Sequence, residues 1–143
     1  TKVRSISHNL YPLHFKTVGL DAELKNYCQL ISSSEFQVKF NSDKNNYLSI
    51  PPLCAKTIYL ISLELINNSL KHSKSKLCFV NLMFNDGTLT LSIEDEGIGF
   101  DLTANKQTQG LKSIKHRLEA LNGSLKIDSK INSGTLVIIE IKI

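Results

Sequence analysis

Two short stretches of this sequence carry side chains whose types and spacing could do chemistry. The first is residues 95–100, Asp-Glu-Gly-Ile-Gly-Phe, in which a carboxylate precedes two glycines one residue apart. It follows the alternating apolar run 89–93, so we expect the acid at a strand end and the glycines in the next loop. Because a carboxylate only accepts hydrogen bonds and glycine permits close backbone approach, this loop is a candidate floor for a flat polar ligand. Taken alone, the pattern is also that of an ordinary turn.

The second stretch is a polar stripe near the end of the longest predicted helix. Glu64 and Asn68 are four residues apart, and Lys71 or His72 follows seven or eight residues after the glutamate, so all lie along one helical face. Acid, amide and ammonium groups in line can hold a magnesium ion through oxygen atoms and contact phosphate through the lysine. The alternative for these residues alone is a solvated helix face.

Three helices must position these groups. They are predicted at 21–31 with Asp21 as N-cap, at 53–71 after a Pro-Pro pair, and at 110–121 before Asn122-Gly123. An earlier helix is expected to end within 1–10. The side of the long helix opposite the polar stripe carries apolar residues that we expect to bury, namely Ile58, Ile61, Leu65, Ile66 and Leu70.

Five strands are predicted from alternation and turn signals, at 35–40, 76–84, 88–95, 124–129 and 135–143. The tripeptide 85–87, Asn-Asp-Gly, is a strong hairpin turn, and the polar segment 101–109 reads as a loop. Adjacent antiparallel strands mixed with helices indicate an α+β fold, a two-layer α/β sandwich with a mixed, roughly five-stranded sheet and three helices on one face. A doubly wound fold would need strictly alternating strands and helices, which this order lacks.

Bulk properties restrict the function classes. The chain has 143 residues and a net charge of +4, with scattered lysines that form no polybasic arm, so we expect no direct contact with nucleic acid. Its apolar stretches are shorter than a membrane span. The odd number of cysteines, three, without a Cys-x-x-Cys pair, argues against a disulfide framework or zinc site and fits a reducing, cytoplasmic location.

Four motifs together resemble the ATP-binding catalytic domain of sensor histidine kinases, in the superfamily shared with gyrase-type and mismatch-repair ATPases. Residues 64–72 match the N box of that family and residues 95–100 match its G1 box. Residues 109–114 resemble the shortened second glycine box, and Gly134-Thr135 resembles the closing Gly-Thr. The resemblance implies a Bergerat-type ATPase fold over 18–143.

The N-terminal residues resemble one subfamily. Residues 5–12 and 18–20 are similar to the junction in kinases paired with LuxR/NarL-type response regulators. We therefore expect 1–17 to be the end of a dimerisation-hairpin helix with its linker, and 18–143 to be the catalytic domain. The parent protein is expected to be a homodimer, whereas a fragment without most of the hairpin is compatible with a monomer.

His8 lies in a stretch close to the phosphoacceptor box of other histidine kinases. An acceptor there would need a second hairpin helix after it, but Pro12 follows four residues later and a strand is expected by Phe36. We expect the acceptor histidine upstream of this chain, with His8 as the alternative.

The resemblance implies a role for each matching residue. Asp95 would accept a hydrogen bond from the exocyclic amine of adenine, with Thr135 beside it under the base. Gly97 and Gly99 would let the backbone approach the base and sugar.

The metal and phosphate roles fall to the helices. Asn68 would bind Mg2+, and Glu64 would act as a polariser or base. Lys71, counted with Glu64 as catalytic, and His72 would contact phosphates. The amides of Gly110 and Leu111, at a helix N-terminus, would receive the phosphate chain. Residues 101–109 would be the ATP lid.

Two departures from the family pattern are visible. The segment 106–110 has one glycine where many relatives have two or three, which affects the lid. Asn67 stands beside Asn68, and the four-residue spacing from Glu64 favours Asn68 as the metal ligand. We expect surface or packing positions for His14 and His116. Arg117 is expected on a solvated helix face, with contact to phosphate or to the hairpin as the alternative.

The expected function is therefore that of a protein histidine kinase. It would bind Mg-ATP and pass the γ-phosphoryl group to a histidine on the hairpin, from which a response regulator would receive it. An anti-sigma-factor-type serine kinase is one alternative, although those proteins lack a hairpin helix at 1–10. A catalytically degenerate nucleotide-binding module is the other, and the intact Glu64, Asn68 and Asp95 argue against it.

Overall fold

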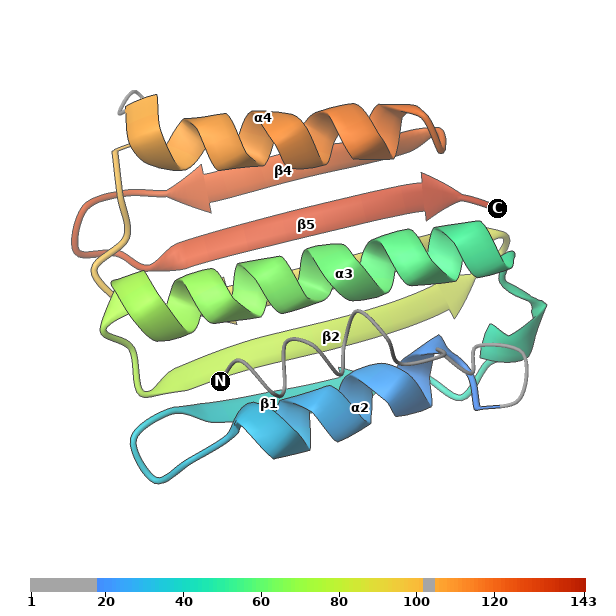
Figure 1. The fold of residues 1–143 in the computed structure, drawn as a ribbon, viewed down its shortest axis with the longest axis horizontal. Coiled ribbons are helices and arrows are strands. Elements are labelled where there is room, and N and C mark those ends of the chain that lie inside the picture. Colours follow the sequence, from blue (N-terminus) through green and yellow to red (C-terminus); the bar gives the residue numbers. More distant parts are fainter. Residues whose placement is uncertain (1–17, 102–104) are drawn as a thin grey trace, which may run out of the picture.

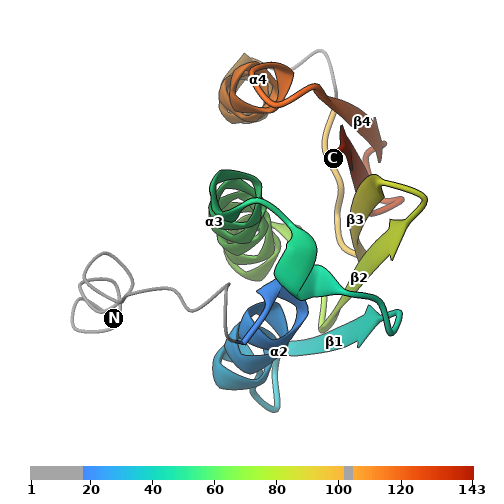
Figure 2. The same cartoon turned by 90° about the vertical axis from the view of Figure 1, so that its right-hand side faces the viewer.

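The computed structural model describes residues 18–101 and 105–143, with 105–109 described by their backbone alone. In this part of the chain, three α-helices cover one face of a five-stranded sheet (Figures 1 and 2). The strands are β1 (Gln37–Ser42), β2 (Leu77–Asn85), β3 (Thr88–Asp95), β4 (Gly123–Ser129) and β5 (Thr135–Lys142). The helices are α2 (Leu20–Ile31), α3 (Pro52–Asn68) and α4 (Asn105–Glu119), with a 3₁₀ turn at Tyr47–Ser49 and a π turn at Ser69–Ser73.

The sheet is mixed and has the order β1-β2-β3-β5-β4. β1 runs parallel to β2, whereas β2–β3, β3–β5 and β5–β4 are antiparallel. A parallel pair needs a long crossover, and here α3 lies within it. This arrangement confirms the predicted α+β two-layer sandwich with three helices on one face.

The core lies between the helices and the sheet, with α3 in the middle of the helical layer (Figure 2). Ile58, Ile61, Leu65 and Ile66 of α3 are buried, as predicted. Leu70 was expected to join them but is 40% exposed. Leu70 follows Leu65 by five residues, which at 3.6 residues per turn is about 140° around the helix, so it lies off the buried face.

The β2–β3 hairpin confirms the predicted turn. Asp86 and Gly87 have φ angles of 51° and 72°, and positive φ at both central residues is the signature of a type I′ turn. This turn sets the register that brings Asp95 opposite Cys78, at the end of β3.

Two predicted boundaries near the N-terminus were wrong. The N-cap of α2 is Gly19 rather than Asp21, which lies in the first turn of the helix. β1 begins at Gln37 rather than two residues earlier. The cause is local, because the amides of Glu35 and Phe36 both donate to the hydroxyl of Ser33 and are held in a turn.

The start of α4 was also wrong. The helix begins at Asn105, so the backbone of 105–109 is helical instead of forming a loop. This part has no apolar periodicity that would predict a helix, although Lys and Gln are good helix formers. The core-facing residues of α4 are Ile114 and Leu118, which are buried.

The predicted helix within 1–10, His8, His14 and the domain boundary at residue 17 lie outside the described residues. Among the described helices, none has both the length and the apolar character that a membrane crossing requires.

The carboxylate of Asp43 joins the segment after β1 to the end of β2. It accepts hydrogen bonds from the Phe84 amide (3.1 and 3.3 Å to its two oxygens), the Asn45 side chain (3.0 Å) and the Tyr47 hydroxyl. Partial burial raises the pKa of Asp43, but these hydrogen bonds outweigh it and hold the pKa below its usual value.

We predict that Asp43→Asn lowers the free energy of unfolding by roughly 0.5–1 kcal/mol at pH 7, because the charge-assisted bonds weaken. Since the folded-state pKa is depressed, this stabilisation is present above the unfolded pKa of about 4 and is lost as pH falls through the folded value. Urea unfolding of both proteins at pH 7 and pH 3 measures it. Asp128→Asn, at an exposed position on β4, is the control. An equal difference between the Asp43 variant and wild type at both pH values would contradict the prediction.

Candidate functional site

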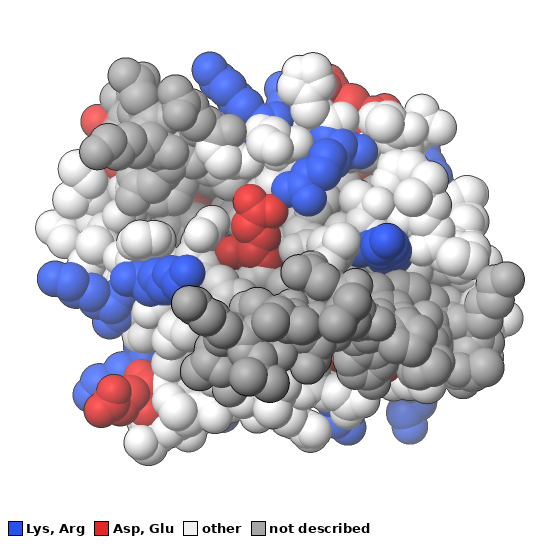
Figure 3. Space-filling view, viewed as in Figure 1, with Lys and Arg blue, Asp and Glu red and all other residues white. Residues whose placement is uncertain are grey.

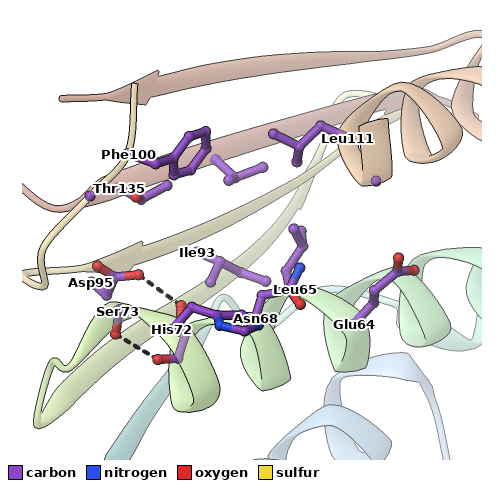
Figure 4. A pocket seen from close by; sticks show the side chains of 14 residues that line it. Glu64, Leu65, Asn68, His72, Ser73, Ile93, Asp95, Phe100, Leu111 and Thr135 are labelled. Carbon is purple, nitrogen blue, oxygen red and sulfur yellow. Dashed lines mark hydrogen bonds between the residues drawn. The ribbon is translucent and has the colours of Figure 1, made fainter. Parts of the chain in front are cut away.

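A cavity of about 700 Å³ lies between α3, the loop after β3, the start of α4 and strands β3 and β5 (Figure 4). Its lining residues are Glu64, Leu65, Asn68, Ser69, His72, Ser73, Ile93, Asp95, Gly99, Phe100, Gly110, Leu111, Thr135 and Val137. Asp95 and Thr135 lie at one end of this cavity, and Glu64 and Leu111 at the other (Figure 4). The structure thus brings together eight of the ten predicted site residues, all except Lys71 and Gly97.

The Asp95 carboxylate is buried and held at both oxygens. The Ser69 hydroxyl donates to Oδ2 (2.8 Å), and the Gly97 amide donates to Oδ1 (3.0 Å). Asp95 is only 6% exposed, so these bonds offset part of the cost of burying a charge. An ionised carboxylate has about four lone-pair sites, so acceptor capacity remains for a donor in the cavity.

Cys78 lies opposite Asp95 on β2 and is fully buried. Burial, and to a smaller extent the charge of Asp95, raises its pKa to about 12. Burial likewise raises the pKa of Cys28 to about 12, with a contribution from Cys78. Both thiols are therefore protonated at neutral pH and act as apolar packing groups.

Gly97 and Gly99 are required by the protein's own packing. A Cβ at Gly97 would lie 2.1 Å from the Ser73 carbonyl oxygen. A Cβ at Gly99, whose φ is +61°, would lie 2.1 Å from the carbonyl oxygen of Lys130. The sequence interpretation, in which both glycines make room for a ligand, missed these contacts. Gly99 lines the cavity, whereas Gly97 does not line it and instead donates its amide hydrogen to the Asp95 carboxylate.

Ser129 joins the remaining parts of this end of the cavity. Its hydroxyl accepts the Phe100 amide (3.0 Å), contacts the Gly134 carbonyl (3.1 Å) and lies 2.8 Å from the Thr135 hydroxyl. Thr135 in turn pairs with Asp95 across β3 and β5. The two residues predicted to recognise a base are thus neighbours, fixed by strand register and by one buried serine.

Sequence reasoning missed Ser69 and Ser129. A signal for Ser69 was available, because it follows Ile61 and Leu65 by eight and four residues and so shares their buried face. A polar residue at such a position needs a partner. Ser129 gave no such signal, since its role depends on the β4–β5 turn.

The polar stripe of α3 reaches the cavity through Glu64, Asn68 and His72. Lys71 does not line it, and its side chain is exposed. The π turn explains this difference, because i→i+5 bonding adds about one residue per turn and moves the eighth residue after Glu64 onto its face. An uninterrupted α-helix would favour the seventh residue.

Asn68 rather than Asn67 faces the cavity. The side-chain amide of Asn67 donates to the Tyr27 hydroxyl (2.7 Å) and the Leu63 carbonyl (2.8 Å), which turns it toward α2. Among the described residues, the Asn68 side chain has no protein hydrogen bond, and no three His, Cys, Asp or Glu side chains form a metal-binding group. An amide oxygen beside a carboxylate fits a magnesium ion that takes its other ligands from water and phosphate.

Gly110 and Leu111 line the cavity. The sequence predicted that they begin a helix, but they lie inside α4. Because α4 starts at Asn105, Gly110 is its sixth residue. The backbone amides without an acceptor inside the helix are those of the first four residues, 105–108. An anion at this helix terminus would therefore lie closer to those amides than to that of Gly110.

The remaining walls are apolar. Leu65, Ile93, Phe100 and Val137 supply them from α3, β3, the loop and β5. A mostly apolar cavity with a few polar groups at its ends is typical of a small-molecule site.

An ion pair borders the cavity at its Glu64 end. Arg117 Nη2 of α4 donates to Glu64 Oε2 at 2.8 Å, although Arg117 was expected on a solvated helix face. On the helix-covered side, Lys and Arg side chains are spread over several elements, with acidic side chains among them (Figure 3). On this side the described residues form no large patch of one charge around the cavity, so its local charge comes from individual side chains such as Glu64 and Arg117.

Comparison with known proteins gives matches along the chain. Residues 55–143 match the family described as histidine kinase-, DNA gyrase B-, and HSP90-like ATPase. The chain is 27% identical to the oxygen sensor histidine kinase NreB of Staphylococcus carnosus, over 99% of this chain and 41% of NreB. It is 29% identical to the signal transduction histidine-protein kinase/phosphatase DegS of Bacillus subtilis, over 91% of this chain and 36% of DegS. The chain thus spans about two fifths of the length of these relatives.

Solved structures share the fold. The histidine kinase domain of the Erythrobacter litoralis EL346 blue-light activated histidine kinase has a TM-score of 0.71 at 23% identity, covering 89% of this chain and 62% of that chain. The Acinetobacter baumannii histidine kinase AdeS has a TM-score of 0.65 at 18% identity, covering 99% and 74%. At these identities the likeness concerns the fold alone.

The glycine contacts lead to a paired prediction. Gly97→Ala should lower the free energy of unfolding by about 2 kcal/mol, because its Cβ meets the Ser73 backbone. Gly110→Ala should raise it by roughly 0.5–1 kcal/mol, because a helical glycine becomes alanine and, outside the backbone of its own helix, no atom of the described residues lies within 4 Å of the new Cβ. Urea unfolding measures both. A destabilised Gly110→Ala would contradict the helical position of Gly110.

Proposed function

This chain belongs to the histidine kinase-, DNA gyrase B-, and HSP90-like ATPase family, and from that premise we propose that it is the ATP-binding catalytic portion of a two-component sensor histidine kinase. The observation that carries the proposal is the buried Asp95 carboxylate at one end of the cavity. Two protein donors fix it, and its remaining lone pairs are available to a ligand.

Adenine fits this end of the cavity. Its exocyclic amine donates hydrogen bonds, which an acceptor-only carboxylate can receive, whereas the carbonyl of guanine at the same position would face Asp95 with no hydrogen to donate. The apolar side chains of Ile93 and Val137 and the ring of Phe100 provide surfaces for a flat heterocycle. Thr135, beside Asp95, supplies a hydroxyl to the same edge.

The phosphate chain would extend toward Glu64. In this proposal Asn68 holds Mg2+ through its amide oxygen, and the ion neutralises charge on the phosphates. His72, which lines the cavity, would contact phosphate, and the amides at the start of α4 would attract an anion. Lys71, outside the cavity lining, is left as a more distant positive charge.

Phosphoryl transfer would then go to a histidine on a dimerisation hairpin of the same protein. Glu64 lies at the far end of the cavity from Asp95 (Figure 4), and in this proposal it orients or deprotonates the attacking imidazole. A response regulator, of the LuxR/NarL type by sequence resemblance, would receive the phosphoryl group. The proposed location is the cytoplasm, and the proposed assembly of the parent protein is a homodimer.

We predict that ATP with Mg2+ raises the melting temperature of this chain and that Asp95→Asn abolishes most of the shift. Ligand at 100 times its Kd stabilises the folded state by about 2.7 kcal/mol. The variant replaces one of the two carboxylate oxygens with an NH2 group, which cannot accept a hydrogen bond from the adenine amine. Thermal unfolding with ATP, GTP and no nucleotide measures this effect.

Three outcomes are informative. A shift with ATP but not GTP supports adenine recognition. No shift with either nucleotide would contradict both the histidine kinase and the serine kinase interpretations. Full ATP affinity in Asp95→Asn would contradict only the assignment of Asp95 as the residue that recognises the base, and not ATP binding itself.

Magnesium gives a separate prediction. Asn68→Ala should retain adenosine binding but lose most of the gain in ATP affinity that Mg2+ provides to the wild type. Titration calorimetry with and without Mg2+ measures both. Asn67→Ala is the matched control, because Asn67 contacts Tyr27 and Leu63 instead of the cavity. A magnesium dependence that disappears in the Asn67 variant but persists in the Asn68 variant would overturn the metal assignment.

A further inference from the structure

The Glu64–Arg117 pair connects α3 and α4, the two helices that contribute residues to the cavity. Arg117 Nη2 lies 2.8 Å from Glu64 Oε2, and the pair joins α3 to α4 across 53 residues of sequence. Glu64 lines the cavity, whereas Arg117 does not. The arginine therefore acts on the cavity by way of the glutamate.

Both partners can form further hydrogen bonds. Only one Glu64 oxygen receives the arginine, and the buried Nε of Arg117 has no hydrogen-bond partner among the described residues. The side chains are 40% and 42% exposed. An ion pair this exposed contributes little to stability, so its presence calls for another reason.

Charge supplies that reason. A carboxylate at the rim of a cavity that receives a polyphosphate repels the ligand, and the repulsion increases with each added phosphate. Ser69, which bonds Asp95, follows Glu64 by five residues, and a rise of 1.5 Å per residue places Ser69 roughly 7–8 Å further along the helix. A nucleotide bound at Asp95 by its base would therefore extend its phosphates toward Glu64.

We propose that Arg117 is a positioning residue for Glu64, which offsets the charge of that carboxylate and holds it at the rim so that a polyphosphate can enter. This inference rests on the proposed function. It assigns Arg117 no direct contact with the nucleotide. Its effect should increase with the number of phosphates and should require the negative charge of Glu64.

The test compares ligands of increasing charge. Arg117→Ala should weaken binding of ATP by about tenfold, weaken ADP less, and leave adenosine within about twofold of wild type. High salt should reduce the loss, because exposed charges are screened. Arg117→Lys should restore most of the ATP affinity, since it keeps the charge. Lys115→Ala removes an equal charge from an exposed position on α4 and is the matched control.

A double-mutant cycle with Glu64→Gln separates two explanations. If Arg117 acts by way of Glu64, removing the arginine in the Glu64→Gln background should change ATP affinity by less than about twofold, because no charge remains to be offset. If Arg117 instead contacts phosphate directly, the tenfold loss will persist in that background, and the proposal is overturned. Isothermal titration gives all affinities.

Controls keep folding and function apart. Melting temperatures of the variants without ligand should stay close to wild type, and Arg117→Gln provides a second neutral variant if Arg117→Ala is unfolded. Failure of wild type to bind adenosine or ATP would contradict the proposed function itself. Wild-type ATP binding with an unaffected Arg117→Ala, or an equal loss with Lys115→Ala, would contradict only the role of Arg117.

Discussion

The buried carboxylate of Asp95 is the constraint on which the site depends. Because it is removed from water, it needs donors, and these come from Ser69 on the π turn and from the amide of Gly97. For that amide to reach it, the loop must pass against the backbone of Ser73, where a side chain on residue 97 would collide. The Ile98 amide donates to the same Ser73 carbonyl at 2.6 Å. One desolvated charge thus determines the hydroxyl on the helix, the glycine in the loop and their close contact.

The same loop is held from its other side by the β4–β5 turn. The Asn132 amide donates to the Ile98 carbonyl at 2.6 Å, and Gly99 approaches the backbone of Lys130. Segments far apart in sequence therefore meet at backbone atoms, and hydrogen bonds between these atoms hold the loop in place. Backbone contacts therefore hold the cavity end that would receive a base, whereas an exposed ion pair borders the end near Glu64.

The sequence was sufficient for the architecture because turns and periodicity are local. Asn85-Asp86-Gly87 predicted the hairpin, and the apolar spacing of α3 predicted its buried face. Features that depend on tertiary or non-α geometry were not predictable in this way. The π turn exchanged Lys71 for His72 at the cavity, and the polar start of α4 concealed its true beginning. Ser129 became important only when the β4–β5 turn placed it beside Phe100 and Thr135.

The π turn at Ser69–Ser73 also means that the number of residues in this segment, and not only their types, decides which side chain meets the cavity. In a uniform α-helix, changing the side chain that meets a ligand requires replacing that residue. Here the additional residue in the turn rotates everything after Asn68 relative to everything before it. Loss of the one residue of the turn that follows His72 would allow a return to α geometry, and Lys71, the seventh residue after Glu64, would then bring an ammonium group to the cavity in place of the imidazole. Insertions and deletions at this point are therefore a route by which relatives of this fold can alter the charge of the site.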